Sequence, residues 1–347
     1  MTSPSLARVL SAVLLFACGG GCGGDDDGGG GGSDGGSGGG DGGSDLPSCP
    51  DVAGEPVAVD LPFVSDGEYF YKASGGQILR TPVDGGASQT LADSPAVIGL
   101  MQLADERLYF VAEDAGAYSL WQMSAGGGTP SLVMPIEDPQ VVRYAVDGEL
   151  VYVFDVDGTE WVLRSVPRTG GDPVELARGP GDLAGAPQVP AALAGQGGRL
   201  YWVTRGGFVR SIDAAGGAIT DLADSAIDIQ ANKDLPDIAL SDTHVAWSII
   251  QQAQTSFPIF RVPLDGGERE TLLDDEVQAL RLVHWDGSLY FVDVADPSDH
   301  HLGRVPAAGG PWEVVACYEP ASSIGGVVVD QTGIYARTPD GTVRFAH

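Results

Sequence analysis

The chain has 347 residues, and its 48 Asp and Glu residues against 18 Lys and Arg residues give a formal net charge of −30 at pH 7. So strong a negative balance argues against nucleic acid and anionic lipid surfaces as partners. The length is sufficient for a sizeable core.

The first 17 residues have the organisation of an export signal. Arg8 supplies a positive charge, and the apolar run that follows is too short to cross a bilayer. The segment ends in Leu15-Phe16-Ala17-Cys18, which resembles a bacterial lipobox, although a small residue is usual at the position of Phe16. The resemblance implies cleavage before Cys18 and attachment of diacylglycerol to its thiol. The alternative is an ordinary secretory signal in which Cys18 has no role.

Residues 18–48 are predicted to be a disordered tether. Between positions 19 and 45 the sequence contains only Gly, Asp, Ser and one cysteine, Cys22, so this stretch has no apolar side chains to bury. Gly/Ser-rich chains behave as flexible coils, and such a coil would hold a folded domain clear of a membrane. The aspartates are an alternative site for Ca²⁺, but without fixed geometry we interpret them as solvated. Cys22 is either a second acylation site or a free thiol.

A repeat organises residues 49–347. Its first copy, Glu68–Leu91, contains an aromatic strand after an Asp-Gly turn, then a second strand, a Gly-Gly turn and a third strand. A lone four-stranded sheet cannot cover both its faces, whereas blades stacked around an axis cover one another. The repeat has a period of 42 to 50 residues, which is typical of propeller blades. We therefore predict an all-β, seven-bladed β-propeller of four-stranded antiparallel blades with little helix; a six-bladed ring is the alternative. The Gly-Gly pairs begin, at intervals of 42 to 50 residues, at Gly85, Gly127, Gly170, Gly216, Gly266 and Gly309.

Closure of the ring is predicted from the two ends of the repeat. The seventh unit supplies only three strands, and propellers commonly borrow a strand from the other terminus, so Val52–Val59 is expected to complete it. This pairing would bring Cys49 beside the end of the sixth unit, where Cys317 lies. Export permits disulfides, and our hypothesis is a Cys49–Cys317 bridge that locks the ring and contributes about 4–5 kcal/mol in the chain-entropy model.

The two faces of such a ring differ in their loops. The turns between strands 1 and 2 and between strands 3 and 4 are uniformly short, and we call their side the short-turn face. The other connections, on the long-loop face, lengthen from the third-to-fourth blade junction onward. Loops on a rigid scaffold usually carry binding, so the sequence predicts a working surface on the long-loop face of blades four to six. Its loops are Ala177–Pro190, Asp221–Asp237, Ile250–Phe257 and Asp293–Leu302.

No set of residues indicates catalysis. One cluster, at Asp293, Asp296, Asp299, His300 and His301, combines imidazoles with carboxylates, the donors that divalent metals use. Its spacing matches no metal motif, and adjacent residues of a strand point to opposite sides. We interpret the cluster as a solvated loop and keep Asp293, Asp299, His300 and His301 as metal-ligand candidates.

Two other patterns have structural interpretations. The segment Asp155–Glu160 is similar to a calcium loop, but it lacks the third oxygen ligand and the distal Glu of the EF-hand pattern, so a plain turn is favoured. Beyond the tether, the sequence contains no Gly-x-Ser-x-Gly elbow, so it gives little support to nucleophilic catalysis. The six tryptophans, which are expected mostly to pack blades and alternatively to stack on sugars, are Trp121, Trp161, Trp202, Trp247, Trp285 and Trp312.

The strand sequences resemble those of a known repeat family. Arg199-Leu200-Tyr201-Trp202 and Ser288-Leu289-Tyr290-Phe291 are similar to the Leu-Tyr-Trp/Phe strand of YWTD-type and TolB-like β-propellers, and the likeness covers most of residues 57–347. The Asp that follows Tyr-Trp-Thr in YWTD-type repeats is absent, since Val203 and Val292 stand next. The resemblance implies the fold but not a function, because propellers host both binders and enzymes.

These observations favour an extracytoplasmic, lipid-anchored β-propeller of the cell envelope, at the outer membrane or cell surface rather than the inner membrane. We expect it to bind a protein or peptide through the long-loop face without catalysis, to need no cofactor, and to contact the membrane only through its lipid. The alternative function is that of an exported lyase or glycoside hydrolase with carboxylates at the central channel. Carbohydrate is a further candidate ligand.

Overall fold

The structure is a computed structural model that describes residues 49–50, 52, 54–57, 59, 63–93, 96–138, 142–180, 188–224, 237–248, 258–273, 277–294, 300–318 and 327–347. Every regular element in these ranges is a β-strand, and none of the described residues forms a helix long and apolar enough to cross a membrane. The predicted export signal, Cys18 and the tether lie outside the described residues.

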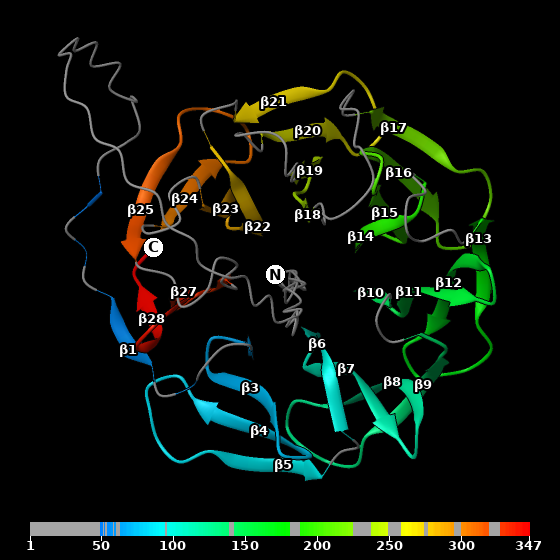
Figure 1. The fold of residues 1–347 in the computed structure, drawn as a ribbon, viewed down its shortest axis with the longest axis horizontal. Helices are drawn as coiled ribbons and strands as arrows, with labels where there is room; N and C mark the ends of the chain where they lie inside the picture. The colour runs from blue at the N-terminus through cyan, green and yellow to red at the C-terminus, as the bar shows by residue number, and fades with distance from the viewer. Residues whose placement is uncertain are drawn as a thin grey trace, which may run out of the picture.

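The strands form seven four-stranded antiparallel sheets around a central axis, which confirms the seven-bladed prediction (Figure 1). Blade 1 comprises β2 (Val64–Ser65), β3 (Tyr69–Ser74), β4 (Gln77–Pro82) and β5 (Gln89–Asp93). Blade 2 comprises β6 (Ala96–Ala104), β7 (Arg107–Asp114), β8 (Ala117–Ser124) and β9 (Ser131–Ile136). Blade 3 comprises β10 (Arg143–Asp147), β11 (Leu150–Asp157), β12 (Glu160–Pro167) and β13 (Val174–Pro180). Blade 4 comprises β14 (Pro190–Gln196), β15 (Arg199–Thr204), β16 (Phe208–Asp213) and β17 (Thr220–Asp224).

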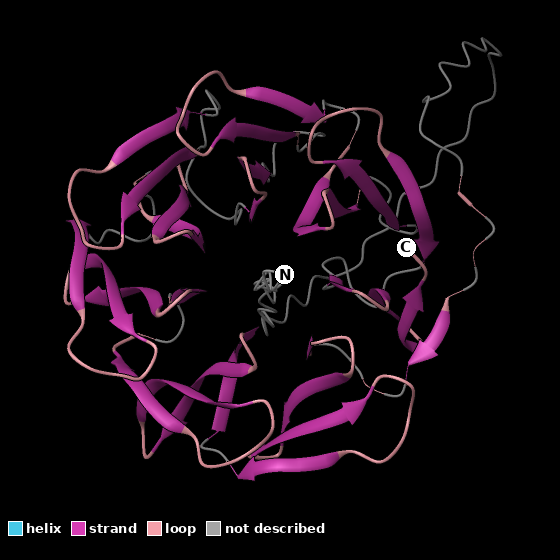
Figure 2. Ribbon diagram, turned by 180° about the vertical axis from the view of Figure 1, so that it is seen from behind, coloured by secondary structure: helices cyan, strands magenta, loops and turns pink. Residues whose placement is uncertain are grey.

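The remaining three blades follow the same order from the axis outward. Blade 5 comprises β18 (Asp237–Leu240), β19 (His244–Ser248), β20 (Ile259–Pro263) and β21 (Glu270–Leu273). Blade 6 comprises β22 (Ala279–Trp285), β23 (Ser288–Asp293), β24 (His300–Pro306) and β25 (Glu313–Tyr318). Blade 7 comprises β26 (Val327–Asp330), β27 (Gly333–Thr338), β28 (Gly341–Phe345) and the N-terminal strand β1 (Glu55–Val57). Figure 2 shows the same ring from behind.

The Gly-Gly turns have a single construction in six blades. In each, the first glycine donates its backbone N–H to the carbonyl three residues earlier, at 2.8–3.1 Å, as Gly85 does to Pro82. Both glycines have positive φ, +95° and +135° in this example, a conformation that costs glycine little. The Pro, Ser or Asp that stands three residues before each glycine pair is therefore the residue whose carbonyl accepts the hydrogen bond of the turn.

The core lies between blades rather than within them. Seven clusters of buried apolar side chains each draw on two neighbouring sheets of the described chain. Tyr71 and Ile78 of blade 1, for example, pack with Leu108 and Phe110 of blade 2. Every blade thus covers its neighbours, which is the physical reason that a single unit could not fold alone.

The ring closes as the sequence predicted, with a shorter strand. Residues 55–57 of β1 pair antiparallel with residues 342–344 of β28, and Glu55 forms an ion pair with Arg344. The sulfur atoms of Cys49 and Cys317 are joined by a disulfide with a Cα–Cα distance of 5.8 Å. The rings of Phe63, Phe70 and Tyr335 also meet where blade 7 contacts blade 1, with centroids 4.5–5.6 Å apart. The disulfide and the β1–β28 pairing therefore tie the N-terminal segment to blades 6 and 7, and the aromatic contacts join blade 7 to blade 1.

Candidate functional site

A cavity of about 490 Å³ lies at the inner strands of blades 2 to 6, and we call it the channel pocket. Its walls come from the last residues of β10, β14, β18 and β22 and from the turns that follow β18 and β22. These are the turns between strands 1 and 2 of each blade, so the pocket lies toward the short-turn face. It is lined by Gln102, Ala145, Asp147, Ala194, Gly195, Gln196, Ile238, Ala239, Leu240, Asp242, Leu282, Val283, His284, Trp285, Asp286 and Gly287.

Three polar side chains of the channel pocket hold neighbouring blades together. Gln102 of blade 2 donates to the carbonyl of Tyr144 in blade 3, at 2.9 Å. Asp147 of blade 3 accepts from the backbone N–H of Gly198 in blade 4, at 2.7 Å. Gln196 of blade 4 donates to the carbonyl of Ser241 in blade 5, at 3.1 Å. Because these three side chains form hydrogen bonds between blades, they are held in place, and we call them the polar wall of the pocket.

The apolar part of the channel pocket lies in blades 5 and 6. Ile238 and Leu282 are buried, whereas Leu240 and Trp285 are partly exposed and lie next to the turns. Small residues occupy the facing wall in blade 4, where a Cβ on Gly195 would lie 2.8 Å from the Cβ of Asp147. A concave surface with apolar residues and a few fixed polar groups is the usual composition of a ligand site.

The carboxylates of the channel pocket are spread over three blades. Asp147 belongs to blade 3, Asp242 to a turn of blade 5 and Asp286 to a turn of blade 6. Within the described ranges, the group of three or more His, Cys, Asp or Glu side chains close enough to share a metal ion is found elsewhere, at Cys49, His301 and Cys317. The pocket acids therefore give its rim a negative charge without forming a metal-binding set.

Two ionisable side chains near the opposite ends of the inner strands, Asp237 and Arg281, are partly buried. Burial raises the pKa of the Asp237 carboxyl, which begins β18, although the charge of Arg281 opposes this shift. Burial likewise lowers the pKa of Arg281. The backbone N–H of Leu282 donates to Asp237 at 3.1 Å, so the carboxylate joins blade 5 to blade 6. This pair lies near the long-loop face and strengthens a blade junction.

The predicted metal-ligand candidates do not act as one cluster in the structure. Asp293, which ends β23, and His301 in β24 are directly paired across the two strands, and Nδ1 of His301 lies 3.6 Å from Oδ2 of Asp293. His300 is buried and its ring meets that of Tyr318, with centroids 6.0 Å apart. Asp299, like Asp296, lies outside the described residues. The alternation of side chains along β24 separates the two histidines, as expected for a strand.

The segment Asp155–Glu160 forms a hairpin. Asp157 pairs with Glu160 across a turn in which Gly158 has a φ of +61°. Asp155 is buried and accepts backbone N–H groups from Glu137 and Val156, at 3.1 and 2.8 Å. Its carboxylate therefore orders the chain that enters blade 3, which agrees with the turn favoured by the sequence.

The tryptophans mostly pack between or within blades. Trp161, Trp202 and Trp247 are buried, and the other three are partly buried. All the tryptophans and tyrosines in the described residues are buried or partly buried, so none of them presents the fully exposed ring of a flat sugar-stacking face. Most of the long loops predicted as the working surface lie outside the described residues, so that assignment stays a prediction.

The channel pocket was not anticipated from the sequence. Asp147, Gln196, Leu240 and Trp285 each end the inner strand of their blade, one repeat apart in the chain. Aligning the repeats at the turn between strands 1 and 2 places these four residues at the end of strand 1 in their repeats. Equivalent positions of a propeller lie around one axis, so this alignment is the sequence signal for the pocket.

Comparison with known proteins supports the fold. No protein-family model matches the sequence, and no curated protein does. Among solved structures, oligogalacturonate lyase in complex with manganese is 11% identical, covers 85% of this chain and 90% of its own, and has a TM-score of 0.59. The N-terminal domain of Nup159 is 10% identical over 85% of this chain and 94% of its own, with a TM-score of 0.51.

A TolB-type structure is also similar, but more distantly. The putative TolB from Agrobacterium tumefaciens is 16% identical over 83% of this chain and 90% of its own, with a TM-score of 0.41. At 10–11% identity, the likeness to the lyase and to the Nup159 domain shows the β-propeller fold alone. The closer YWTD-type and TolB-like relationship stays a prediction from the strand sequences.

Proposed function

We propose that this chain is an extracytoplasmic binding protein, anchored in a membrane by lipid on Cys18 and spaced from it by the tether, that holds a peptide segment of a partner protein in the channel pocket. The observation that carries the proposal is the pocket itself. Leu240 and Trp285 offer accessible apolar surface, while the polar wall is fixed by hydrogen bonds between blades. A preformed site of this kind binds without a large ordering cost.

The rim of the channel pocket specifies the chemistry of the occupant. Asp242 and Asp286 lie on its turns, and the whole chain is strongly acidic. A negative rim around an apolar floor favours a segment with an apolar side chain flanked by Lys or Arg. Repulsion of acidic segments would add selectivity.

An enzymatic role as a lyase or glycoside hydrolase has less support. The three carboxylates of the channel pocket come from three different blades, and Oδ2 of Asp147 already accepts the backbone N–H of Gly198. The solved lyase structure resembles this chain in fold at 11% identity, which carries no catalytic residue over. The long-loop face of blades four to six stays a second proposed contact surface for the same partner.

Selection of displayed peptides on the full-length protein tests the binding proposal. We expect enriched sequences to contain an apolar residue beside Lys or Arg. Leu240→Arg, which fills the pocket and reverses the local charge, should weaken their binding at least about tenfold, or about 1.4 kcal/mol. Leu132→Arg is the matched control, because Leu132 is exposed on the outer strand β9. Equal binding to both variants would contradict the pocket as the site.

The anchor is tested separately. Wild-type protein should partition into detergent and carry an acyl modification at its mature N-terminus, and Cys18→Ser should move it to the aqueous phase. The Cys22→Ser variant distinguishes a second acylation site from a free thiol. Detergent partitioning that persists in Cys18→Ser would show that the proposed lipid attachment is wrong.

A further inference from the structure

Blade 6 carries a row of reactive side chains that the proposed function does not use. Asp293, His301 and Cys317 are direct cross-strand partners on β23, β24 and β25. Directly opposed residues of an antiparallel sheet project to the same face, so the carboxylate, imidazole and sulfur lie in line. Cys49 completes the row through its disulfide to Cys317.

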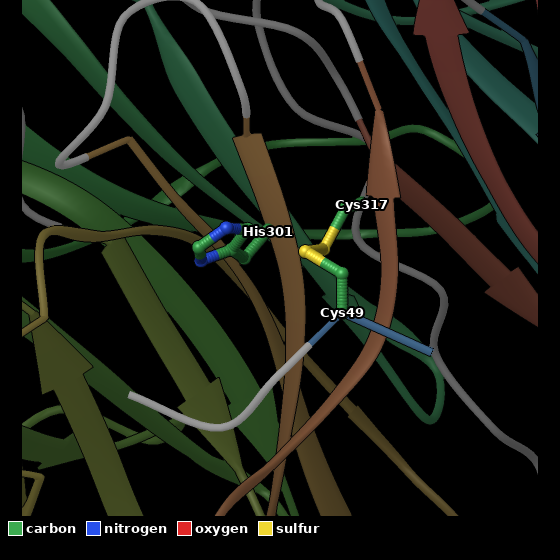
Figure 3. A group of neighbouring side chains, drawn as sticks. All are labelled: Cys49, His301 and Cys317. Atoms are coloured by element: carbon green, nitrogen blue, oxygen red, sulfur yellow. A yellow bond between two sulfur atoms is a disulfide. The ribbon is translucent and has the colours of Figure 1, made fainter. Parts of the chain in front are cut away.

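The distances within this row are short. A ring nitrogen of His301 and the two sulfur atoms lie within 4.8 Å of one another, and the ring stands beside the disulfide (Figure 3). On its other side, Nδ1 of His301 is 3.6 Å from Oδ2 of Asp293. Asp293 is 1% exposed, and its Oδ1 accepts the backbone N–H of Gln278 at 2.9 Å. The imidazole is therefore held between a fixed carboxylate and two sulfurs.

We propose that reduction of the Cys49–Cys317 disulfide creates a site for a thiophilic divalent cation such as Zn²⁺, with both cysteine sulfurs and His301 as ligands. A dithiol reductant supplies two electrons and two protons; the S–S bond breaks, two thiols form, and the reductant becomes a cyclic disulfide. Binding of the cation then releases the two thiol protons. Water completes the coordination, since Cys49 is exposed to solvent.

The ligand geometry suits this cation. Two Zn–S bonds of about 2.3 Å at a tetrahedral angle place the sulfurs roughly 3.8 Å apart. Cysteines whose Cα atoms are 5.8 Å apart can reach that separation by side-chain rotation. Nδ1 of His301 faces Asp293, which leaves Nε2 as the ligand and makes Asp293 a positioning residue, the usual partner of a metal-bound histidine.

Other contacts close the ring when the Cys49–Cys317 disulfide is reduced. The pairing of β1 with β28 and the ion pair between Glu55 and Arg344 are independent of the disulfide. A bound cation would join the same two points that the disulfide joins. In the oxidised protein the disulfide links Cys49 to Cys317, and in the reduced protein a bound cation links the same two residues.

The test uses the full chain in a Cys18→Ser, Cys22→Ser background, which leaves only the two cysteines of the site. The protein is examined oxidised, and again after reduction by a dithiol and anaerobic removal of the reductant. Zn²⁺ is measured by equilibrium dialysis, and Co²⁺ by its thiolate charge-transfer absorption. We expect one equivalent of cation in the reduced protein and none at the site in the oxidised protein.

Three variants assign the ligands. His301→Ala should lower the affinity of the reduced protein for Zn²⁺ at least about 100-fold, and Asp293→Asn, which keeps an acceptor for Gln278, about 10–100-fold with an unchanged Co²⁺ spectrum at saturation. His244→Ala, on β19 of blade 5, is the control and should bind as wild type. Equal binding by oxidised and reduced protein, no binding after reduction, or full affinity in His301→Ala would each overturn the proposal.

Discussion

Asp330 joins the last blade to the first, and we expect its removal to weaken the closure of the ring. Its side chain is 1% exposed. Oδ1 accepts from the backbone N–H of Thr332 at 2.7 Å and of Gly333 at 3.2 Å, and Oδ2 accepts from the hydroxyl of Ser65 in blade 1. The hydroxyl of Thr332 also donates to Oδ1, at 2.5 Å, so Asp330→Ala leaves four donors without their acceptor. An unpaired buried donor costs about 1–3 kcal/mol, and with partial relaxation we expect a loss of about 3–5 kcal/mol in the free energy of unfolding.

The conservative variant separates the hydrogen bonds from the charge. Asp330→Asn keeps an oxygen for Thr332 and Gly333, and its amide can donate to the Ser65 hydroxyl, so the loss should be about 1–2 kcal/mol. With an unfolding entropy of about 2.1 cal/mol/K per residue, a domain of this length loses about 1.6 °C of Tm per kcal/mol. The expected decreases are therefore about 5–8 °C for the alanine variant and about 2–3 °C for the asparagine variant.

Thermal unfolding of the full-length protein, followed by circular dichroism, measures both decreases. It should be repeated after reduction, because the Cys49–Cys317 disulfide also fastens the N-terminal segment that completes blade 7. Asp84→Ala, at an exposed turn of blade 1, is the matched control and should change stability by less than about 0.5 kcal/mol. A Tm for Asp330→Ala equal to that of the control, or equal losses in the alanine and asparagine variants, would refute this account of the closure.

Three further outcomes follow from the fold. Intact-mass analysis with alkylation should find Cys49 and Cys317 as thiols only after reduction, and their replacement by Ser should cost about 2–4 kcal/mol; two alkylated thiols in untreated protein would contradict the bridge. Gly303→Ala places a Cβ 2.3 Å from Cζ of Phe291, so we expect a loss of about 1–3 kcal/mol that Phe291→Leu partly restores; a fully additive double variant would argue against this contact. Because burial raises the pKa of Asp237, the folded state binds its proton more tightly than the unfolded state, whose pKa is about 3.9. Wild type should therefore gain stability relative to Asp237→Asn as pH falls from 7 toward that value, and chemical denaturation showing a relative loss would indicate a lowered pKa.

The ring was predictable because its determinants are local and repeated. Gly85 and its five equivalents need positive φ, and glycine provides it at a fixed interval after the residue whose carbonyl accepts the turn hydrogen bond. Aromatic strands such as Tyr69–Ser74 follow turns at the same spacing. Closure by β1 followed from counting strands in the last unit.

A second repeated feature was present in the sequence but was not recognised. Arg261 forms an ion pair with Glu270, and Arg304 with Glu313, in each case across strands 3 and 4 of one blade. The interval of nine residues is the same in both blades. These partly exposed pairs contribute little stability individually, but they mark the outer hairpin of the repeat.

The residues of the two sites come together through the strand register and through the placement of the blades around the axis. Neither can be read from a single sequence. Leu240 and Trp285 both line the channel pocket because blades 5 and 6 are neighbours and each residue ends the inner strand of its blade. The alignment of His301 with Cys317 requires the pairing of β24 with β25, which shifts register between Leu302 and Gly303. The sequence places His301 next to His300, whereas the fold places its ring between Asp293 and the disulfide.

Site-specific photo-cross-linking tests the central claim, that a partner segment occupies the channel pocket. A photoreactive phenylalanine analogue would replace Leu240 in the pocket, or Leu132 on β9, in the lipidated protein in its native membrane. We predict one discrete, mass-identifiable polypeptide adduct from position 240, absent from position 132 and competed by peptides selected on the purified protein. No adduct from position 240, or the same adduct from both positions, would contradict the claim.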